Sequence, residues 1–286
     1  MTTVLRIAVQ KSGRLHDGSM ELLRACGLAV NNGRDQLKLR IPNFPVELLF
    51  LRDDDIPQYV ADRVADAGMV GENVVAEKNL SQSIIRKLDF AKCRLALAVP
   101  RGDQYTGPEW LQGKNIATSY PVITGRWLAE RGITASLHVI SGSVEIAPGI
   151  GLADAICDLV STGSTLLSNG LKEVETVISS EAVIIASEGL SEDKQAILSK
   201  LLFRMNAVQS ARSNKYILMN IPNESIPRIA AVIPGMNSPT IMPLGRAGWS
   251  SLHAVVDEND FWEKIDLLKS FGAEGILVLP IEKMIP

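Results

Sequence analysis

Short apolar runs that end in polar turns recur along the first part of the chain. Leu5–Val9 ends in the turn Lys11-Ser12-Gly13-Arg14, Val46–Leu51 ends in a run of acids, and Ala67–Val70 ends in Gly71-Glu72-Asn73. The segments between them have helical spacing of apolar residues, and the first of these segments stops at Gly27. This alternation of strand, helix and strand predicts a parallel α/β sheet.

The alternation restarts after the turn-rich Arg101–Pro108, which indicates a second lobe. The expected strands are Cys93–Val99, Asn115–Thr118, Ser136–Ile140, Ala155–Val160, Val174–Ile178 and Ala182–Ala186, with a helix at Ile123–Arg131. A long amphipathic helix opened by Ser191 follows. We expect lobe I to comprise residues 1–93 and 182–212 and lobe II residues 94–181, with the chain returning to lobe I after Glu181.

The tail has a pattern of its own, which predicts a separate domain over residues 213–286. Its order is βαββαβ: Lys215–Ile221, Glu224–Ile233 with Asn223 as N-cap, Pro239–Leu244, Trp249–Val256, a helix capped by Asp257, and Gly275–Ile281. This order is typical of a ferredoxin-like unit. The fold class predicted is therefore α/β, with a two-lobed body and a C-terminal ferredoxin-like domain.

Composition excludes several classes of protein. The 286 residues are 46% hydrophobic and 21% charged, which argues against disorder. Lys and Arg total 29 against 32 acids, and the net charge of −3 argues against a nucleic-acid partner. The three cysteines are far apart, which predicts no disulfide framework, and the three histidines are scattered, which predicts no built-in metal site. The sequence also shows no signal-like segment and no apolar run of membrane length. Together these features predict a cytoplasmic protein.

The most informative stretch runs from residue 153 to residue 165. An apolar strand carrying Asp158 leads into Ser161-Thr162-Gly163-Ser164-Thr165, a turn of small residues directly before a helix-like segment. Backbone N–H groups and hydroxyls in such a turn suit a phosphate monoester, and the carboxylate suits ribose hydroxyls. Asp154 lies ~13 Å from Asp158 if the strand is extended, so the two carboxylates are not expected to bind the same ligand atoms unless Asp154 lies in a turn. An ordinary Ser/Thr helix cap beside a solvated Asp remains the alternative.

These residues carry a resemblance. The segment from Asp158 to Thr165 resembles the phosphoribosyl pyrophosphate (PRPP) loop of phosphoribosyltransferases, and the frame from Glu145 through Gly151 to Leu166 resembles the signature of the ATP phosphoribosyltransferase family. Further similar stretches are Gln10–Leu15, Arg52–Pro57, Gly71–Val74, Leu88–Phe90 with Cys93-Arg94, Ala117–Pro121 and Leu279–Met284. The resemblance covers essentially the whole chain and its length matches the long form of the family.

The resemblance implies an activity and an architecture. The expected reaction transfers phosphoribose from PRPP to N1 of ATP, releases pyrophosphate with Mg²⁺, and begins histidine biosynthesis. The expected body resembles periplasmic binding proteins, the expected assembly is a dimer that forms hexamers, and histidine is the expected feedback inhibitor. The PRPP site implied by the matching residues comprises Glu145, Asp154, Asp158, Ser161, Thr162, Gly163, Ser164 and Thr165.

Other polar turns are candidates for phosphate and nucleotide contacts. Lys11 and Arg14 are expected to stabilise the leaving pyrophosphate, because adenine N1 is already a nucleophile and needs no general base. The further candidates are Ser12, Gly13, Arg52, Gly71 and Glu72. Taken from the residues alone, a solvated turn, a local Arg–Asp ion pair and a helix cap remain equally ordinary interpretations of these segments.

In the tail, the resemblance implies a histidine site at Thr240 and Asn220, where related enzymes carry Asp in place of Asn. The loss of that charge predicts weaker inhibition. A tail that serves only for assembly remains the alternative for this domain. For the whole chain, the alternatives are a catalytically silent regulatory paralogue and a small-molecule-binding or sensory module.

Overall fold

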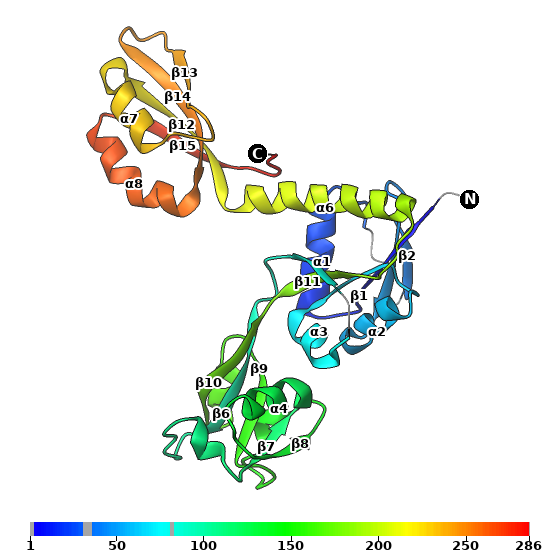
Figure 1. The fold of residues 1–286 in the computed structure, drawn as a ribbon. Coiled ribbons are helices and arrows are strands. Elements are labelled where there is room, and N and C mark those ends of the chain that lie inside the picture. Colours follow the sequence, from blue (N-terminus) through cyan, green and yellow to red (C-terminus); the bar gives the residue numbers. More distant parts are fainter. Residues whose placement is uncertain (1–2, 31–35, 81–82, 286) are drawn as a thin grey trace. The chain divides into compact units, whose positions relative to one another are not determined.

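The computed structural model describes residues 3–30, 36–80 and 83–285, and three β-sheets organise them (Figure 1). The first two sheets form the two lobes of the body and the third forms the C-terminal domain. The expected α/β class, with a two-lobed body and a ferredoxin-like C-terminal domain, is confirmed.

The first sheet has the strand order β2-β3-β1-β4-β11-β5. Its strands are β1 (Leu5–Gln10), β2 (Lys38–Arg40), β3 (Val46–Leu51), β4 (Ala67–Gly71), β5 (Ser83–Lys87) and β11 (Ala182–Ala186), and its helices are α1 (Arg14–Ala25), α2 (Ile56–Ala61) and α3 (Glu72–Lys78). β3, β1 and β4 are parallel, so their carboxyl ends share one edge of the sheet. Because β11 pairs with β4, the chain does return to this sheet after Glu181.

The second sheet has the order β10-β6-β9-β7-β8. Its elements are β6 (Cys93–Pro100), β7 (Asn115–Thr118), α4 (Pro121–Ala129), β8 (Ser136–Val139), β9 (Ala155–Val160), α5 (Ser164–Ser168) and β10 (Leu171–Ser180). The parallel pairing predicted for the first three strands is confirmed in β3, β1 and β4. Both sheets are nevertheless mixed, because β6 runs antiparallel to β9 and β10, and β11 runs antiparallel to β4. A strand that carries the chain from one lobe to the other has no crossover helix to keep it parallel.

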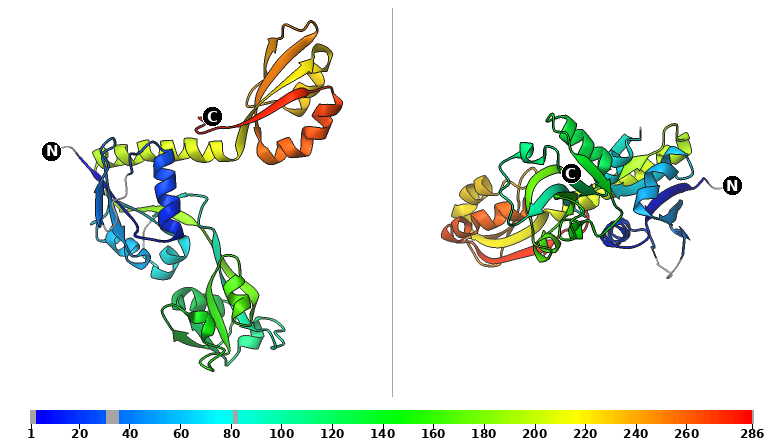
Figure 2. Two further views of the ribbon diagram at one scale, coloured as in Figure 1. Left: turned by 180° about the vertical axis from the view of Figure 1, so that it is seen from behind. Right: turned by 90° about the horizontal axis from the view of Figure 1, so that it is seen from below.

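The C-terminal domain has the order β13-β14-β12-β15, the 4-1-3-2 arrangement of a ferredoxin-like unit read from the other edge. Its elements are β12 (Asn214–Pro222), α7 (Ile226–Val232), β13 (Thr240–Pro243), β14 (Trp249–Asp257), α8 (Glu258–Ser270) and β15 (Glu274–Pro280). The two helices cover one face of the sheet (Figures 1 and 2), where Ile217, Leu252, Phe261 and Leu268 are buried together.

The chain divides into two compact units inside α6 (Glu192–Arg212), one of residues 1–21 and 29–197, the other of 22–28 and 198–286. This division differs from the expected boundary near residue 212, because the second half of α6 and residues 22–28 belong to the C-terminal unit.

No helix among the described residues has the length and apolar composition of a membrane span.

Two expected helix caps have different outcomes. Asp257 caps α8 as predicted, with its carboxylate accepting from the backbone N–H of Asn259 at 2.9 Å. Asn223 does not cap α7, because residues 223–225 form a separate 3₁₀ turn and Ser225 precedes the helix. The Asn223 amide oxygen instead accepts from the Ser250 hydroxyl at 2.7 Å.

Candidate functional site

The turn between β9 and α5 gathers the hydroxyl-rich residues of the predicted phosphate loop. Gly163 adopts φ of +80°, a left-handed conformation that favours glycine, and α5 begins at the next residue. The Thr162 and Ser164 hydroxyls lie 3.1 Å apart, and both side chains are exposed together with Thr165. The loop therefore presents several hydroxyls from one short turn.

Two carboxylates lie beside this loop. Asp158 stands on β9, and Glu145 on the 3₁₀ turn Val144–Ile146 that contacts β9. Burial raises the pKa of Asp158 to about 6; the negative charge of Glu145 adds to the rise and the backbone N–H of Leu159 opposes it. Glu145 therefore lies close enough to Asp158 for its charge to affect the pKa of that carboxyl.

Asp154 does not join this group, which corrects the prediction that placed it there. It precedes β9, at the strand end opposite to the loop. Its carboxylate accepts from the backbone N–H of Asn115 at 2.9 Å and lies 3.7 Å from the Lys114 ammonium. These partners give Asp154 a role in holding β9 beside β7.

The turn after β1 provides the candidate cations. Gly13 has φ of +92° and α1 begins at Arg14. The Arg14 guanidinium donates to the Ser161 hydroxyl at 2.9 Å, which joins this turn to the phosphate loop. Ser12 lies exposed in the same turn. Within the described part of the chain, neither Lys11 nor Arg14 has a carboxylate at ion-pair distance.

The remaining candidates for phosphate and nucleotide contacts have different surroundings. Gly71 ends β4, and a methyl group on its Cα would collide with the Asn73 amide oxygen, so a larger residue here would displace the Asn73 side chain. Glu72 begins α3 and pairs with the Lys87 ammonium at 3.0 Å. Arg52 is exposed just after β3 and, among the described residues, has no carboxylate partner. The expected local ion pair between Arg52 and its neighbouring acids is therefore not formed.

A cavity of about 240 Å³ lies where the first sheet's carboxyl edge meets the phosphate loop. It is lined by Gln10, Arg14, Leu15, Asp53, Gly71, Asn73, Ala91, Lys92, Cys93, Leu159, Ser161 and Ala182. Three of these residues were predicted from the sequence as site residues: Arg14, Gly71 and Ser161. Glu72 lines a neighbouring cavity instead.

Asp53 is a cavity residue that the sequence interpretation missed. Burial raises the pKa of its carboxyl to about 6; the charge of Asp54 adds to this and the Gly71 N–H opposes it. Its position directly after a buried strand was a usable signal, but the run of three acids suggested only a favourable first turn of a helix.

Asn73 is the second missed residue, and it is 3% exposed. Its amide oxygen accepts from the Ser180 hydroxyl at 2.8 Å, and its amide nitrogen donates to the Tyr120 hydroxyl at 3.0 Å. Ser180 ends β10 and Tyr120 precedes α4. One side chain from the first lobe therefore holds two elements of the second.

Arg94 supports the phosphate loop from β6 and was also missed. Its guanidinium binds the Glu173 carboxylate with two hydrogen bonds of 2.6 Å each and donates to the Ser161 carbonyl at 3.3 Å. Hydrogen bonding to Glu173 raises the pKa of the guanidinium further above its usual value. The sequence contained the Arg but no sign that antiparallel pairing of β6 and β10 would bring Glu173 to it.

In the C-terminal domain, the predicted histidine residues flank β14. Thr240 pairs with His253 and Asn220 pairs with Ser251, so the two lie two residues apart along that strand. The His253 imidazole lies between the Tyr216 hydroxyl at 3.0 Å and the Ser251 hydroxyl at 3.1 Å. The structure therefore brings Thr240 and Asn220 to one part of the sheet, with His253 between them.

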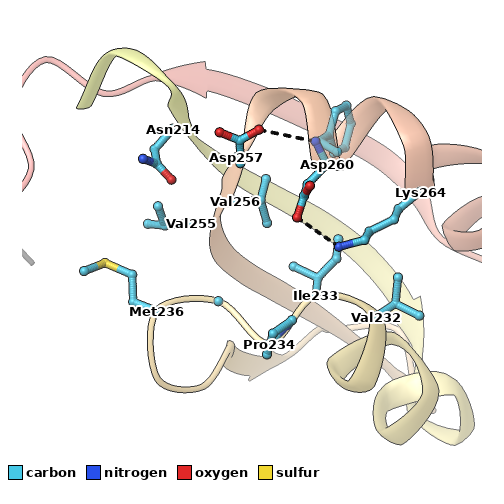
Figure 3. Close-up of a pocket in the computed structure, with 12 residues that line it drawn as sticks. Asn214, Val232, Ile233, Pro234, Met236, Val255, Val256, Asp257, Asp260 and Lys264 are labelled. Carbon is cyan, nitrogen blue, oxygen red and sulfur yellow. Dashed lines mark hydrogen bonds and ion pairs between the residues drawn. The ribbon is translucent and has the colours of Figure 1, made fainter. Parts of the chain in front are cut away.

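A separate cavity of about 250 Å³ lies beside Asn214 at the start of β12 and Asp257 at the end of β14 (Figure 3). Its apolar wall includes Ile233, Val256 and Phe261, and its polar wall carries the ion pair between Asp260 and Lys264 at 3.2 Å. Neither Asn220 nor Thr240 lines it.

Comparison with known proteins identifies the family. Residues 52–207 match the family model of ATP phosphoribosyltransferase, and residues 211–283 match the model of the HisG C-terminal domain. An ATP phosphoribosyltransferase of Cytophaga hutchinsonii is 58% identical over 285 residues, covering 100% of both chains. One of Parabacteroides distasonis is 58% identical over 282 residues, covering 99% of this chain and 100% of the relative.

A solved structure agrees with these matches. A chain of the ATP phosphoribosyl transferase (HisG:HisZ) complex from Thermotoga maritima superposes with a TM-score of 0.60 at 28% identity, covering 71% of this chain and 98% of that one. The protein described here therefore belongs to the ATP phosphoribosyltransferase family, and it transfers phosphoribose from PRPP to ATP in the first step of histidine biosynthesis.

Proposed function

We propose that the transfer takes place in the cavity between the β1 turn and the β9–α5 loop, with PRPP held by the loop. The observation that carries this proposal is the 2.9 Å hydrogen bond from Arg14 to Ser161, because it joins a cationic turn of one lobe to the hydroxyl-rich turn of the other. Ser161, Thr162, Gly163, Ser164 and Thr165 would hold the 5-phosphate. Asp158 and Glu145 would face the ribose hydroxyls.

The chemistry needs charge stabilisation more than proton transfer. Adenine N1 attacks C1 of the ribose with its own lone pair, while the C1–O bond breaks and its electrons leave with pyrophosphate. Lys11 and Arg14 suit the leaving group, since no carboxylate in the described structure neutralises them. The carboxylates of Asp158 and Glu145 suit the positive charge that develops on the ribose.

We assign Mg²⁺ to the phosphate oxygens of the substrates. Nowhere in residues 3–30, 36–80 or 83–285 do three or more His, Cys, Asp or Glu side chains gather in a way that would hold a metal ion. Phosphate and pyrophosphate oxygens are ligands that Mg²⁺ prefers. A Mg²⁺ ion held there would supply positive charge to the leaving pyrophosphate, and the residues of the cavity would position the substrate complex.

We also propose that histidine regulates this cytoplasmic enzyme through Thr240 and Asn220, and that the C-terminal domain takes part in a dimer that assembles to a hexamer. The support for regulation is that Thr240 pairs with His253 and Asn220 with Ser251, two residues away on the same strand. A tail that serves only for assembly would leave the reaction insensitive to histidine.

The test is pyrophosphate release from PRPP and ATP with Mg²⁺, measured with and without histidine and with the nucleotide product confirmed by mass. We expect release that needs both substrates and falls with histidine. Arg14→Ala should lower turnover and Thr162→Val should raise the KM for PRPP, whereas Lys38→Ala, at an exposed strand distant in sequence from the loop, serves as the control. Unchanged kinetics in Arg14→Ala and Thr162→Val would contradict the site.

A further inference from the structure

Asp53 occupies the shared carboxyl edge of the parallel strands. It follows β3, which pairs with β1, and β1 pairs in turn with β4. β1 and β4 end at Gln10 and Gly71, and these two residues line the same cavity as Asp53. The backbone N–H of Gly71 faces the Asp53 carboxyl and opposes the rise of its pKa. Its Oδ1 atom is buried and has no hydrogen-bond partner in the described part of the chain.

This oxygen needs a donor that the protein does not supply. A carboxylate is an acceptor only, and a buried acceptor without a partner costs free energy that the fold must recover elsewhere. The guanidinium that lines the same cavity, Arg14, donates to Ser161 instead. A ligand that enters the cavity with a hydrogen-bond donor would satisfy Asp53.

The chemistry of the two substrates indicates which of them supplies the donor to Asp53, and this step rests on the site proposed above. PRPP offers ribose hydroxyl donors and phosphate oxygen acceptors. Its hydroxyls are assigned above to Asp158 and Glu145 of the second lobe. The adenine of ATP offers N–H donors only at its exocyclic amino group, which adjoins the reacting N1. We propose that Asp53 Oδ1 accepts a hydrogen bond from this amino group and is a further catalytic residue of the transfer.

The same hydrogen bond would strengthen during the reaction. As N1 bonds to C1 and pyrophosphate leaves with the electrons of the C1–O bond, positive charge spreads over N1, C6 and the amino nitrogen. The amino N–H becomes a stronger donor, and a carboxylate that faces it stabilises the transition state more than the bound substrate. Asp53 would thus both select an adenine and promote attack by it.

The experiment pairs an enzyme variant with a substrate variant. Wild type, Asp53→Ala and the control Asp54→Ala are assayed with ATP and with purine riboside 5′-triphosphate, which keeps N1 and lacks the amino group. Asp54 is the exposed neighbour in the same turn. With ATP, we expect Asp53→Ala to lower kcat/KM about 10- to 100-fold. With the analogue, the two enzymes should differ by less than about twofold, because the partner is already absent.

The analogue's intrinsically altered N1 reactivity affects both enzymes equally and cancels in this comparison. Equal losses with both nucleotides would overturn the proposal. So would a raised Kd for PRPP with no change for ATP, or a defect that excess Mg²⁺ repairs. Wild type that fails to transfer to ATP would instead refute the underlying site. Asp53→Asn, checked by thermal melting, provides a second variant if the Ala variant does not fold.

Discussion

Replacing Asp158 by Asn tests whether the loop carboxylate is kept at the expense of stability. Burial raises the pKa of this group from 3.8 to about 6. Between these values the folded protein holds a proton that the unfolded chain has released, so stability falls as pH rises through this window and stays lower above it. A shift of this size corresponds to about 3 kcal/mol at pH 8, and roughly half of this develops between pH 5 and pH 8.

We therefore expect the Asp158→Asn variant to gain stability relative to wild type on going from pH 5 to pH 8, by about 1 kcal/mol. The assay is urea unfolding of the full chain followed by circular dichroism at both pH values. The same variant should lose PRPP use, because the amide lacks the negative charge proposed to face the ribose. Asp154→Asn is the matched control: its carboxylate is bound by Lys114 and the Asn115 N–H, so its removal should destabilise the protein. A pH-independent difference between Asp158→Asn and wild type would refute this reasoning.

Three further predictions follow from contacts in the structure. Arg94→Lys loses the two-bond pairing with Glu173 and the contact to the Ser161 carbonyl, and should raise the KM for PRPP more than it lowers kcat in steady-state kinetics. Asn220→Asp supplies a negative charge for a ligand amine and should lower the histidine concentration that halves activity. Asp257→Ala removes the cap of α8 and should destabilise the C-terminal domain by about 1 kcal/mol in urea unfolding.

The architecture was predictable because its signals are local. Apolar runs of strand length, each closed by a polar turn, identified the strands of both lobes except the edge strands β2 and β5, and the βαββαβ order identified the tail. Gly163 in a left-handed turn likewise follows from its neighbours in sequence. The direction of β6, β10 and β11 was not predictable in this way, since strand pairing depends on partners far along the chain.

The site was predictable where one segment supplies it and not where several segments meet. The phosphate loop is a continuous run, so its residues were found together. Arg94 and Glu173 meet across paired strands, and Asn73 joins Ser180 and Tyr120 from two distant segments. Asp154 shows the converse error: it shares a segment with Asp158, but its carboxylate serves the neighbouring strand.

The two carboxyl groups with pKa values raised to about 6 by burial, Asp53 and Asp158, come from different sheets of the body. Neither has an ion-pair partner in the described structure, so each lowers the stability of the free protein at neutral pH. Substrates that donate to these carboxylates would recover that free energy on binding. Because one carboxylate belongs to each lobe, PRPP would recover the contribution of Asp158 and ATP that of Asp53, so each substrate would gain affinity from its own lobe.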